Sequence, residues 1–89
     1  MLDKEAVSRI MQARGYVWNE YLGCWATDTG KYPFEHKTTE QSNLECHDLN
    51  VLIGVCMKNN LQLAIQYNLY RDLEAVQRAV MFATAKALK

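Results

Sequence analysis

Apolar and polar positions alternate along residues 61–70, which is the most regular pattern in the chain. A period of two fits a strand with one apolar and one polar face. Asp72 then offers an N-cap, and apolar residues recur after it at steps of three and four, as they do on one face of a helix. We expect the apolar faces of this strand and this helix to meet in the core. The residues predicted to meet there are Leu63, Ile65, Leu73, Val76 and Val80.

A shorter helix is predicted near the start of the chain, with Asp3 as its cap and Gly15 as its stop. Its apolar residues fall on one side and predict a single buried face. They are Ala6, Val7, Ile10 and Met11.

Residues 16–34 are rich in aromatic and β-branched side chains and are interrupted by turn-forming residues. This composition predicts two strands, about 16–21 and 24–27, followed by a tight turn. A short third strand is expected near 31–34. Because Pro33 has no N–H to donate, that third strand should lie at an edge of the sheet.

A polar loop is predicted over residues 35–43, and Ser42 with Glu45 has the spacing of a capping box that begins a helix reaching about Lys58. This helix carries two apolar stripes, of which only one can meet the sheet. The first stripe is Leu49, Leu52, Ile53 and Cys56, and the second is Leu44, Val51 and Val55.

The second stripe needs a neighbouring helix or another copy of the chain to cover it. Phe82 poses the same problem, because it lies on the opposite side of its helix from Val80. We therefore consider a homodimer that buries Leu44, Val51, Val55 or Phe82. Coverage by a neighbouring helix of the same chain is the equal alternative.

The predicted order of elements is α-β-β-(β)-α-β-α, within one α+β domain over residues 1–89. The polar face of strand 61–70 indicates that the helices pack mainly on one side of an antiparallel or mixed sheet. Apolar residues make up 49% of the sequence, enough for a packed core.

Ten basic residues balance ten acidic ones, which argues against a general nucleic-acid binder. The acidic residues are nevertheless concentrated in one stretch, which contains Glu35, Glu40, Glu45 and Asp48. The sequence also shows no signal peptide and no apolar run long enough for a membrane span. With three cysteines, an odd number, the expectation is a cytoplasmic protein with free thiols.

Metal and nucleophile chemistry have candidate residues in this chain but not their usual spacing. The possible ligands are Cys24, His36, Cys46, His47 and Cys56. Zinc sites normally use ligand pairs two to four residues apart, and no such cysteine pair occurs. Adjacent residues on a helix point about 100° apart, so Cys46, His47 and Asp48 cannot act together as a triad. We therefore expect no metal, no cofactor and no enzymatic activity.

Aromatic residues are concentrated between positions 16 and 34 and are the most informative feature. Alternation places rings on both faces of the predicted sheet, and a core can use only one face. Tryptophan and tyrosine are common anchors of protein interfaces. The predicted contact residues are Trp18, Tyr21, Trp25 and Tyr32, with the acidic stretch as their rim.

Two alternatives remain open for these rings. They can simply enlarge a small core. They can also form a small-ligand or nucleotide-binding site, which a pocket lined by Trp18, Trp25 and a basic group would favour.

The overall pattern resembles small bacteriophage-encoded proteins, including the group described as the phage ABA sandwich domain. The likeness rests on an aromatic first half (Trp18, Tyr21, Trp25, Tyr32), a central helix, an alternating strand and an alanine-rich final helix. Anti-CRISPR proteins are similar in size and also lack enzyme motifs. The resemblance implies stoichiometric binding to a host or defence-system protein, as an inhibitor.

Overall fold

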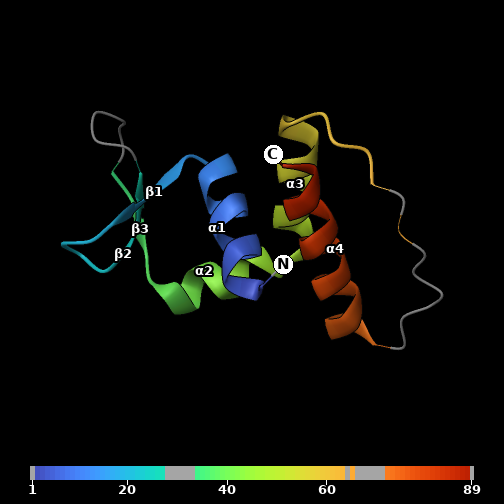
Figure 1. Ribbon diagram of the computed structural model, residues 1–89, viewed down its shortest axis with the longest axis horizontal. Helices are drawn as coiled ribbons and strands as arrows, with labels where there is room; N and C mark the ends of the chain where they lie inside the picture. The colour runs from blue at the N-terminus through green and yellow to red at the C-terminus, as the bar shows by residue number, and fades with distance from the viewer. Residues whose placement is uncertain (1, 28–33, 64, 66–71, 89) are drawn as a thin grey trace.

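Helices and an antiparallel sheet form the described part of this protein, in a computed structural model that describes residues 2–27, 34–63, 65 and 72–88. The predicted α+β class with an antiparallel sheet is confirmed. Figure 1 shows the sheet at one end, α1 and α2 beside it, and α3 and α4 farther away. The described elements are α1 (Asp3–Ala13), β1 (Tyr16–Asn19), β2 (Cys24–Thr27), β3 (His36–Lys37), α2 (Thr39–Cys46), α3 (Leu49–Lys58) and α4 (Leu73–Ala87).

The sheet has the order β1-β2-β3, so β3 lies at an edge. β3 is formed by His36 and Lys37, whereas the strand expected at an edge was placed near 31–34. Phe34 has no strand structure, and residues 31–33 lie outside the described residues. β1 and β2 form a hairpin in which Trp18 pairs with Trp25.

The hairpin turn between β1 and β2 is held by Asn19. Its carbonyl oxygen accepts a hydrogen bond from the Gly23 N–H at 2.9 Å, and its side-chain Oδ1 accepts one from the Leu22 N–H at 3.0 Å. Gly23 has a φ of +62°, a left-handed conformation that glycine adopts without steric cost. These bonds fix the geometry of the tip of the hairpin.

The region predicted as a loop followed by one long helix is instead two helices. Thr38 caps α2 through a capping box one turn earlier than predicted: its Oγ1 accepts from the Gln41 N–H, and Gln41 Oε1 accepts from the Thr38 N–H. Asp48 caps α3 by accepting from the N–H groups of Asn50 and Val51. Because a carboxylate in this position competes for backbone N–H groups, it ends one helix and begins the next.

The strand predicted over residues 61–70 is not found in its described part. Residues 61–63 and 65 have no strand structure, and residues 64 and 66–70 lie outside the described part. The Leu61 N–H donates to the Cys56 carbonyl oxygen at 2.9 Å, and Asn60 has a positive φ of 54°. This arrangement is a Schellman end to α3. Leu61 therefore completes a helix terminus instead of starting a strand.

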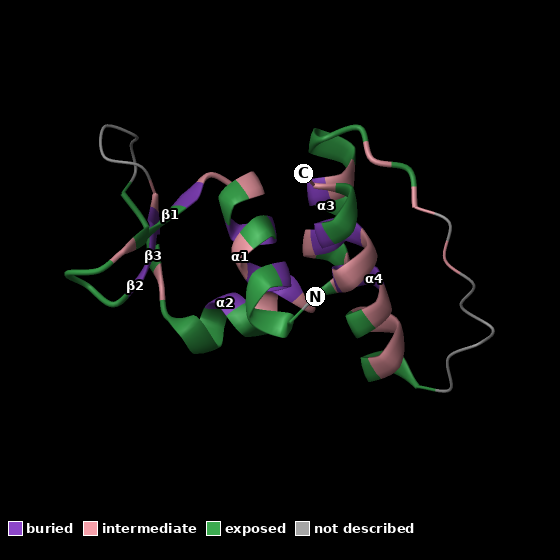
Figure 2. Cartoon of the chain, in the orientation of Figure 1, coloured by how far each residue is buried: buried purple, intermediate pink, exposed green. Residues whose placement is uncertain are grey.

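The core lies between the four described helices and extends to β1 and β2, as the buried residues in Figure 2 show. All four apolar residues predicted on the first helix are buried. On α4, however, the buried residues are Val80, Met81, Thr84 and Ala85, because α4 packs against α1 and α3 and not against a sheet. The full core cluster is Ala6, Val7, Ile10, Met11, Tyr16, Trp25, Cys46, Leu52, Val55, Val80, Met81 and Ala85.

Several residues that were predicted in the core are exposed or only partly buried in the structure. Leu73 is 63% exposed at the first turn of α4. Ile65 and Val76 are partly buried against the core, and Leu63 is half-buried. Ile53 was predicted to share a stripe with Leu52 but is exposed. Of the predicted core set, Val80 alone is fully inside the cluster.

None of the helices described here has the length and apolar character that crossing a membrane requires.

Candidate functional site

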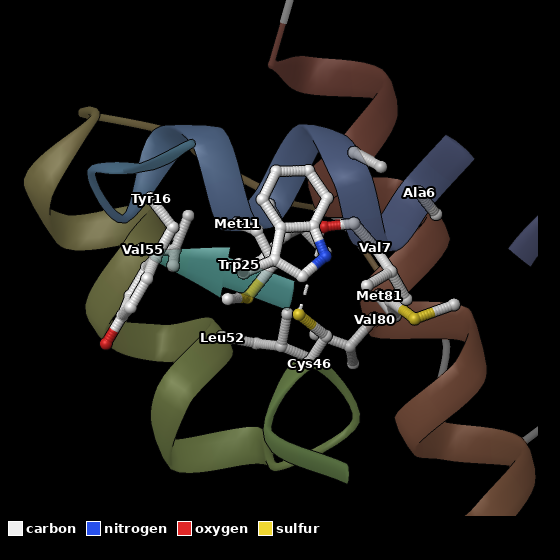
Figure 3. Close-up of a cluster of buried hydrophobic side chains, with 12 residues drawn as sticks. Ala6, Val7, Met11, Tyr16, Trp25, Cys46, Leu52, Val55, Val80 and Met81 are labelled. Atoms are coloured by element: carbon white, nitrogen blue, oxygen red, sulfur yellow. Dashed lines mark hydrogen bonds between the residues drawn. The ribbon is translucent and has the colours of Figure 1, made fainter. Parts of the chain in front are cut away.

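The two tryptophans lie side by side but differ in exposure. Their ring centroids are 5.5 Å apart with planes at 74°, an edge-to-face pair. Trp25 is 8% exposed and belongs to the core, among Val7, Met11 and Cys46 (Figure 3). Trp18 is 44% exposed. Trp18 is therefore the tryptophan that is available to a partner, and Trp25 supports it from beneath.

The tip of the hairpin presents two more large side chains to solvent. Tyr21 is fully exposed and Leu22 is more than half exposed, immediately after the strand that carries Trp18. We call Trp18, Tyr21 and Leu22 the hairpin surface. Of the other predicted contact residues, Trp25 is buried, and Tyr32 lies outside the described residues.

A hollow of about 1160 Å³ lies between α1, α2 and the first two strands. We call it the tryptophan groove. Its apolar lining comes from Val7 on α1 and from β1 and β2: Tyr16, Val17, Trp18 and Trp25. Trp18 thus belongs to both the groove and the hairpin surface.

Polar side chains line the two helical walls of the groove. Lys4, Ser8 and Gln12 follow one another on α1 at steps of four, as do Thr39, Asn43 and His47 along α2 and its C-cap. Residues four apart lie on the same helix face, so each wall is a continuous polar stripe. Asp3 is the remaining lining residue, and its carboxylate forms an ion pair with Arg78 at 3.1 Å.

His47 has a defined orientation in its wall. Its Nδ1 lies 2.6 Å from the carbonyl oxygen of Asn43. Because a carbonyl oxygen only accepts, Nδ1 of His47 carries a proton and donates it to Asn43.

The four acidic residues that were predicted to form a rim have different roles in the structure. Glu45 forms ion pairs with Arg14 at 2.8 Å and with Lys37 at 3.2 Å. Glu35 accepts a hydrogen bond from the Tyr16 hydroxyl at 3.2 Å. Asp48 caps α3. Glu40 is exposed in the first turn of α2. Three of the predicted rim carboxylates therefore have partners within the fold, and the role of the stretch as a rim stays a prediction.

The ion pairs of Glu45 alter its acidity. Burial opposes ionisation and is the largest single influence, but the hydrogen bonds and positive charges of Arg14 and Lys37 together outweigh it and lower the pKa of the Glu45 carboxyl below its ordinary value. A carboxyl whose pKa is lower in the folded state stabilises the fold above its unfolded pKa, and this contribution is lost as the pH falls through the folded pKa.

We expect Glu45→Gln to be less stable than the parent near neutral pH and to lose less stability on acidification, because it has no carboxylate to protonate. Urea unfolding at about pH 7 and about pH 3, followed by circular dichroism, measures both effects. Glu40→Gln is the matched control on the same helix and should keep the acid sensitivity of the parent. Equal acid sensitivity of Glu45→Gln and the parent would show that the ion pairs contribute nothing.

The cysteines are separated in the structure. Cys46 is fully buried, with its Sγ 4.0 Å from the Val7 carbonyl oxygen, and burial raises the pKa of its thiol to about 11. A thiol of this kind is protonated near neutral pH and is a poor nucleophile. Cys24 is also buried, and Cys56 contacts the Thr84 hydroxyl at 3.6 Å. Within residues 2–27, 34–63, 65 and 72–88, His, Cys, Asp and Glu side chains form no group of three suited to a metal ion.

The predicted self-association stripe is split by the break between α2 and α3. Val55 is buried in the core and Val51 is half-buried, so a second copy cannot reach Val55 without unfolding this one. Phe82 packs against the core. Leu44 is exposed on α2. Other helices of the same chain thus cover much of the predicted self-association surface. A homodimer stays a prediction, and Leu44 is the predicted contact residue that is exposed.

Sequence reasoning missed the polar walls of the groove. The signal was present as polar residues at steps of four on the first helix. On α2 the same four-residue spacing was not recognised, because the polar residues 35–43 predict a loop, although Thr39 and Asn43 lie within a helix.

Comparison of the chain with protein-family models, with curated proteins and with solved structures found no match. The hairpin surface and the tryptophan groove are therefore the basis for assigning a function.

Proposed function

We propose that this protein acts by stoichiometric binding to another protein and catalyses no reaction of its own. The observation that carries the proposal is the exposure of Trp18, Tyr21 and Leu22 on one hairpin. Aromatic side chains of this kind supply much of the binding energy of protein interfaces. A monomeric protein rarely leaves several large apolar side chains together in water without a use for them.

The rigidity of the hairpin supports the same function. Asn19 holds the turn through two hydrogen bonds, and Trp18 rests on the buried ring of Trp25. Side chains that are already ordered lose less conformational entropy on binding. The hairpin surface is therefore preorganised for contact.

The nature of the partner is suggested by the resemblance to small phage-encoded proteins. We propose an inhibitor of a bacterial defence complex that works in the cytoplasm of the host cell. The resemblance is one of pattern, carried by the aromatic hairpin and the alanine-rich final helix. A pull-down from bacterial lysate with tagged protein is the direct way to identify the partner.

Once a partner is identified, we expect Trp18→Ala and Tyr21→Ala each to weaken binding by about 2 kcal/mol, roughly thirtyfold, mainly through faster dissociation. Surface plasmon resonance measures both rates. Leu73→Ala is the control, because it removes an exposed apolar side chain from α4, outside the hairpin surface. Circular dichroism establishes that each variant is folded. Parent-like affinity of both aromatic variants would remove the hairpin surface from the interface.

A second candidate function is the binding of a small planar ligand or nucleotide in the tryptophan groove. One observation favours it: Trp18, Trp25 and the basic side chain of Lys4 line the same hollow. Against a nucleotide, the part of the lining that the structure describes contains one lysine and no arginine, whereas charge-assisted bonds from Arg or Lys are the strong contacts to phosphate. We therefore place protein binding first.

A further inference from the structure

The two walls of the tryptophan groove have a common direction relative to the sheet. α1 leads into β1, so Gln12 is the stripe residue nearest the sheet and Lys4 is the farthest. α2 follows β3, so Thr39 is nearest the sheet and His47 is the farthest. Each wall therefore begins with a neutral hydrogen-bonding group at the sheet; the α1 wall ends with the ammonium group of Lys4 and the α2 wall with the imidazole of His47.

The length of the walls indicates the size of what they can hold. Each stripe covers eight residue steps of a helix, or about 12 Å at 1.5 Å per residue. An extended peptide advances about 3.3 Å per residue, so about four residues match one wall. Side-chain amides such as those of Gln12 and Asn43 both donate and accept, as the main chain of an extended peptide requires.

The charge at the far end of the groove favours an anionic group. Among the described residues that line the groove, Lys4 is the only lysine or arginine, and the Nδ1–H of His47 is already used by the Asn43 carbonyl. The one lining carboxylate, Asp3, is paired with Arg78 outside the groove. The ammonium group of Lys4 is thus the charge left for a ligand to complement.

Resting on the proposed binding function, we infer that the tryptophan groove receives an extended acidic segment of the partner protein. An apolar or aromatic side chain of that segment contacts Trp18 beside the sheet, its main chain bonds to the amide walls, and a carboxylate about four residues away meets Lys4. The groove would therefore select partners by their amino-acid sequence, in addition to the contact area that the hairpin surface supplies.

Random peptides displayed on phage and selected on the immobilised, full-length protein test the inference directly. We expect selected peptides to share a large apolar residue and an Asp or Glu about four positions apart. Both tryptophans of the chain line this groove, so the binding of a synthetic copy of a selected peptide should change the intrinsic tryptophan fluorescence.

Two charge variants separate groove binding from general attraction. Lys4→Glu should weaken binding of the selected acidic peptide about threefold to tenfold, and replacing the peptide carboxylate by its amide should remove most of that difference. Lys58→Glu is the matched control, because Lys58 is exposed at the end of α3 and is not a lining residue. Equal effects of the two reversals would overturn the inference.

Other outcomes distinguish this inference from the proposed function. Selected peptides that change the fluorescence but carry no acidic residue would overturn the acidic preference and leave the hairpin surface in place. Failure to select any peptide, with a fluorescence response to free nucleotides instead, would assign the groove to a small ligand. Loss of partner binding on Tyr21→Ala tests the proposed function separately, because Tyr21 does not line the groove.

Discussion

Trp25→Ala should lower the free energy of unfolding by about 3–5 kcal/mol, the cost of removing a large aromatic side chain from a packed core. Trp25 is nearly inaccessible and lies in the cluster that includes Met11 and Cys46. Total stabilities of small domains are about 5–15 kcal/mol, so this change would leave a substantial unfolded fraction. Urea unfolding followed by far-ultraviolet circular dichroism measures the difference without relying on tryptophan emission.

Trp18→Ala is the matched variant, since it removes the same side chain from the other half of the edge-to-face pair. Trp18 is partly exposed, and the aromatic contact itself is worth about 0.5–1.5 kcal/mol. We therefore expect a much smaller loss of stability. If Trp25→Ala unfolded at the same urea concentration as the parent, the position of the hairpin on α1 and α2 would be wrong.

Replacing leucine by alanine at three different positions should have very different effects on the free energy of unfolding. Leu52→Ala removes a side chain that is 0% exposed on α3 and should cost about 2–5 kcal/mol in the free energy of unfolding. Leu44→Ala and Leu73→Ala should each change it by less than about 0.5 kcal/mol, because Leu44 is 75% exposed and Leu73 more than half exposed. Thermal or urea unfolding of the three variants side by side is sufficient.

This series also tests the revised core. The helical spacing of apolar residues placed Leu73 in the core and Leu44 in a self-association surface, whereas the structure exposes both. A large loss of stability in Leu73→Ala would show that Leu73 belongs to the core, as the sequence predicted. A concentration-dependent loss of stability in Leu44→Ala would instead favour a homodimer, because dimer stability depends on protomer concentration.

Elements whose signals are local were predicted well from the sequence. The apolar face of the first helix, strands close to the predicted 16–21 and 24–27, and the Asp72 cap of the last helix all appear in the structure. Each depends on residues within a few positions of one another. The core partners of α4 could not be derived in this way, since its packing against α1 joins segments at opposite ends of the chain.

Two predictions failed because another local signal was stronger. The Thr38–Gln41 capping box begins a helix earlier than the Ser42–Glu45 pattern, and Asp48 then starts a new one. At Leu61, the end of α3 takes the backbone N–H that a strand would use. The apolar stripe of the predicted long helix and the alternation from Leu61 are both present in the sequence. In both places, however, a helix cap determines the local backbone structure.

The candidate site was only partly visible in the sequence. The aromatic cluster and its position on two strands were predicted, and the structure shows that Trp18 is exposed and Trp25 is buried. Periodicity could not make this distinction, because the two residues are cross-strand partners on the same face of the sheet. Trp25 lies on the central strand β2 and belongs to the core cluster, whereas Trp18 lies on the edge strand β1.

The contact between α1 and α4 has a consequence for the order in which the protein matures during translation. The described residues that line the groove all precede position 48, whereas Arg9 on α1 donates a hydrogen bond to the Ala85 carbonyl and Asp3 pairs with Arg78. A ribosome therefore synthesises these lining residues before it synthesises the helix that packs against α1. The core residues of α1 can meet those of α4 only after α4 has been made.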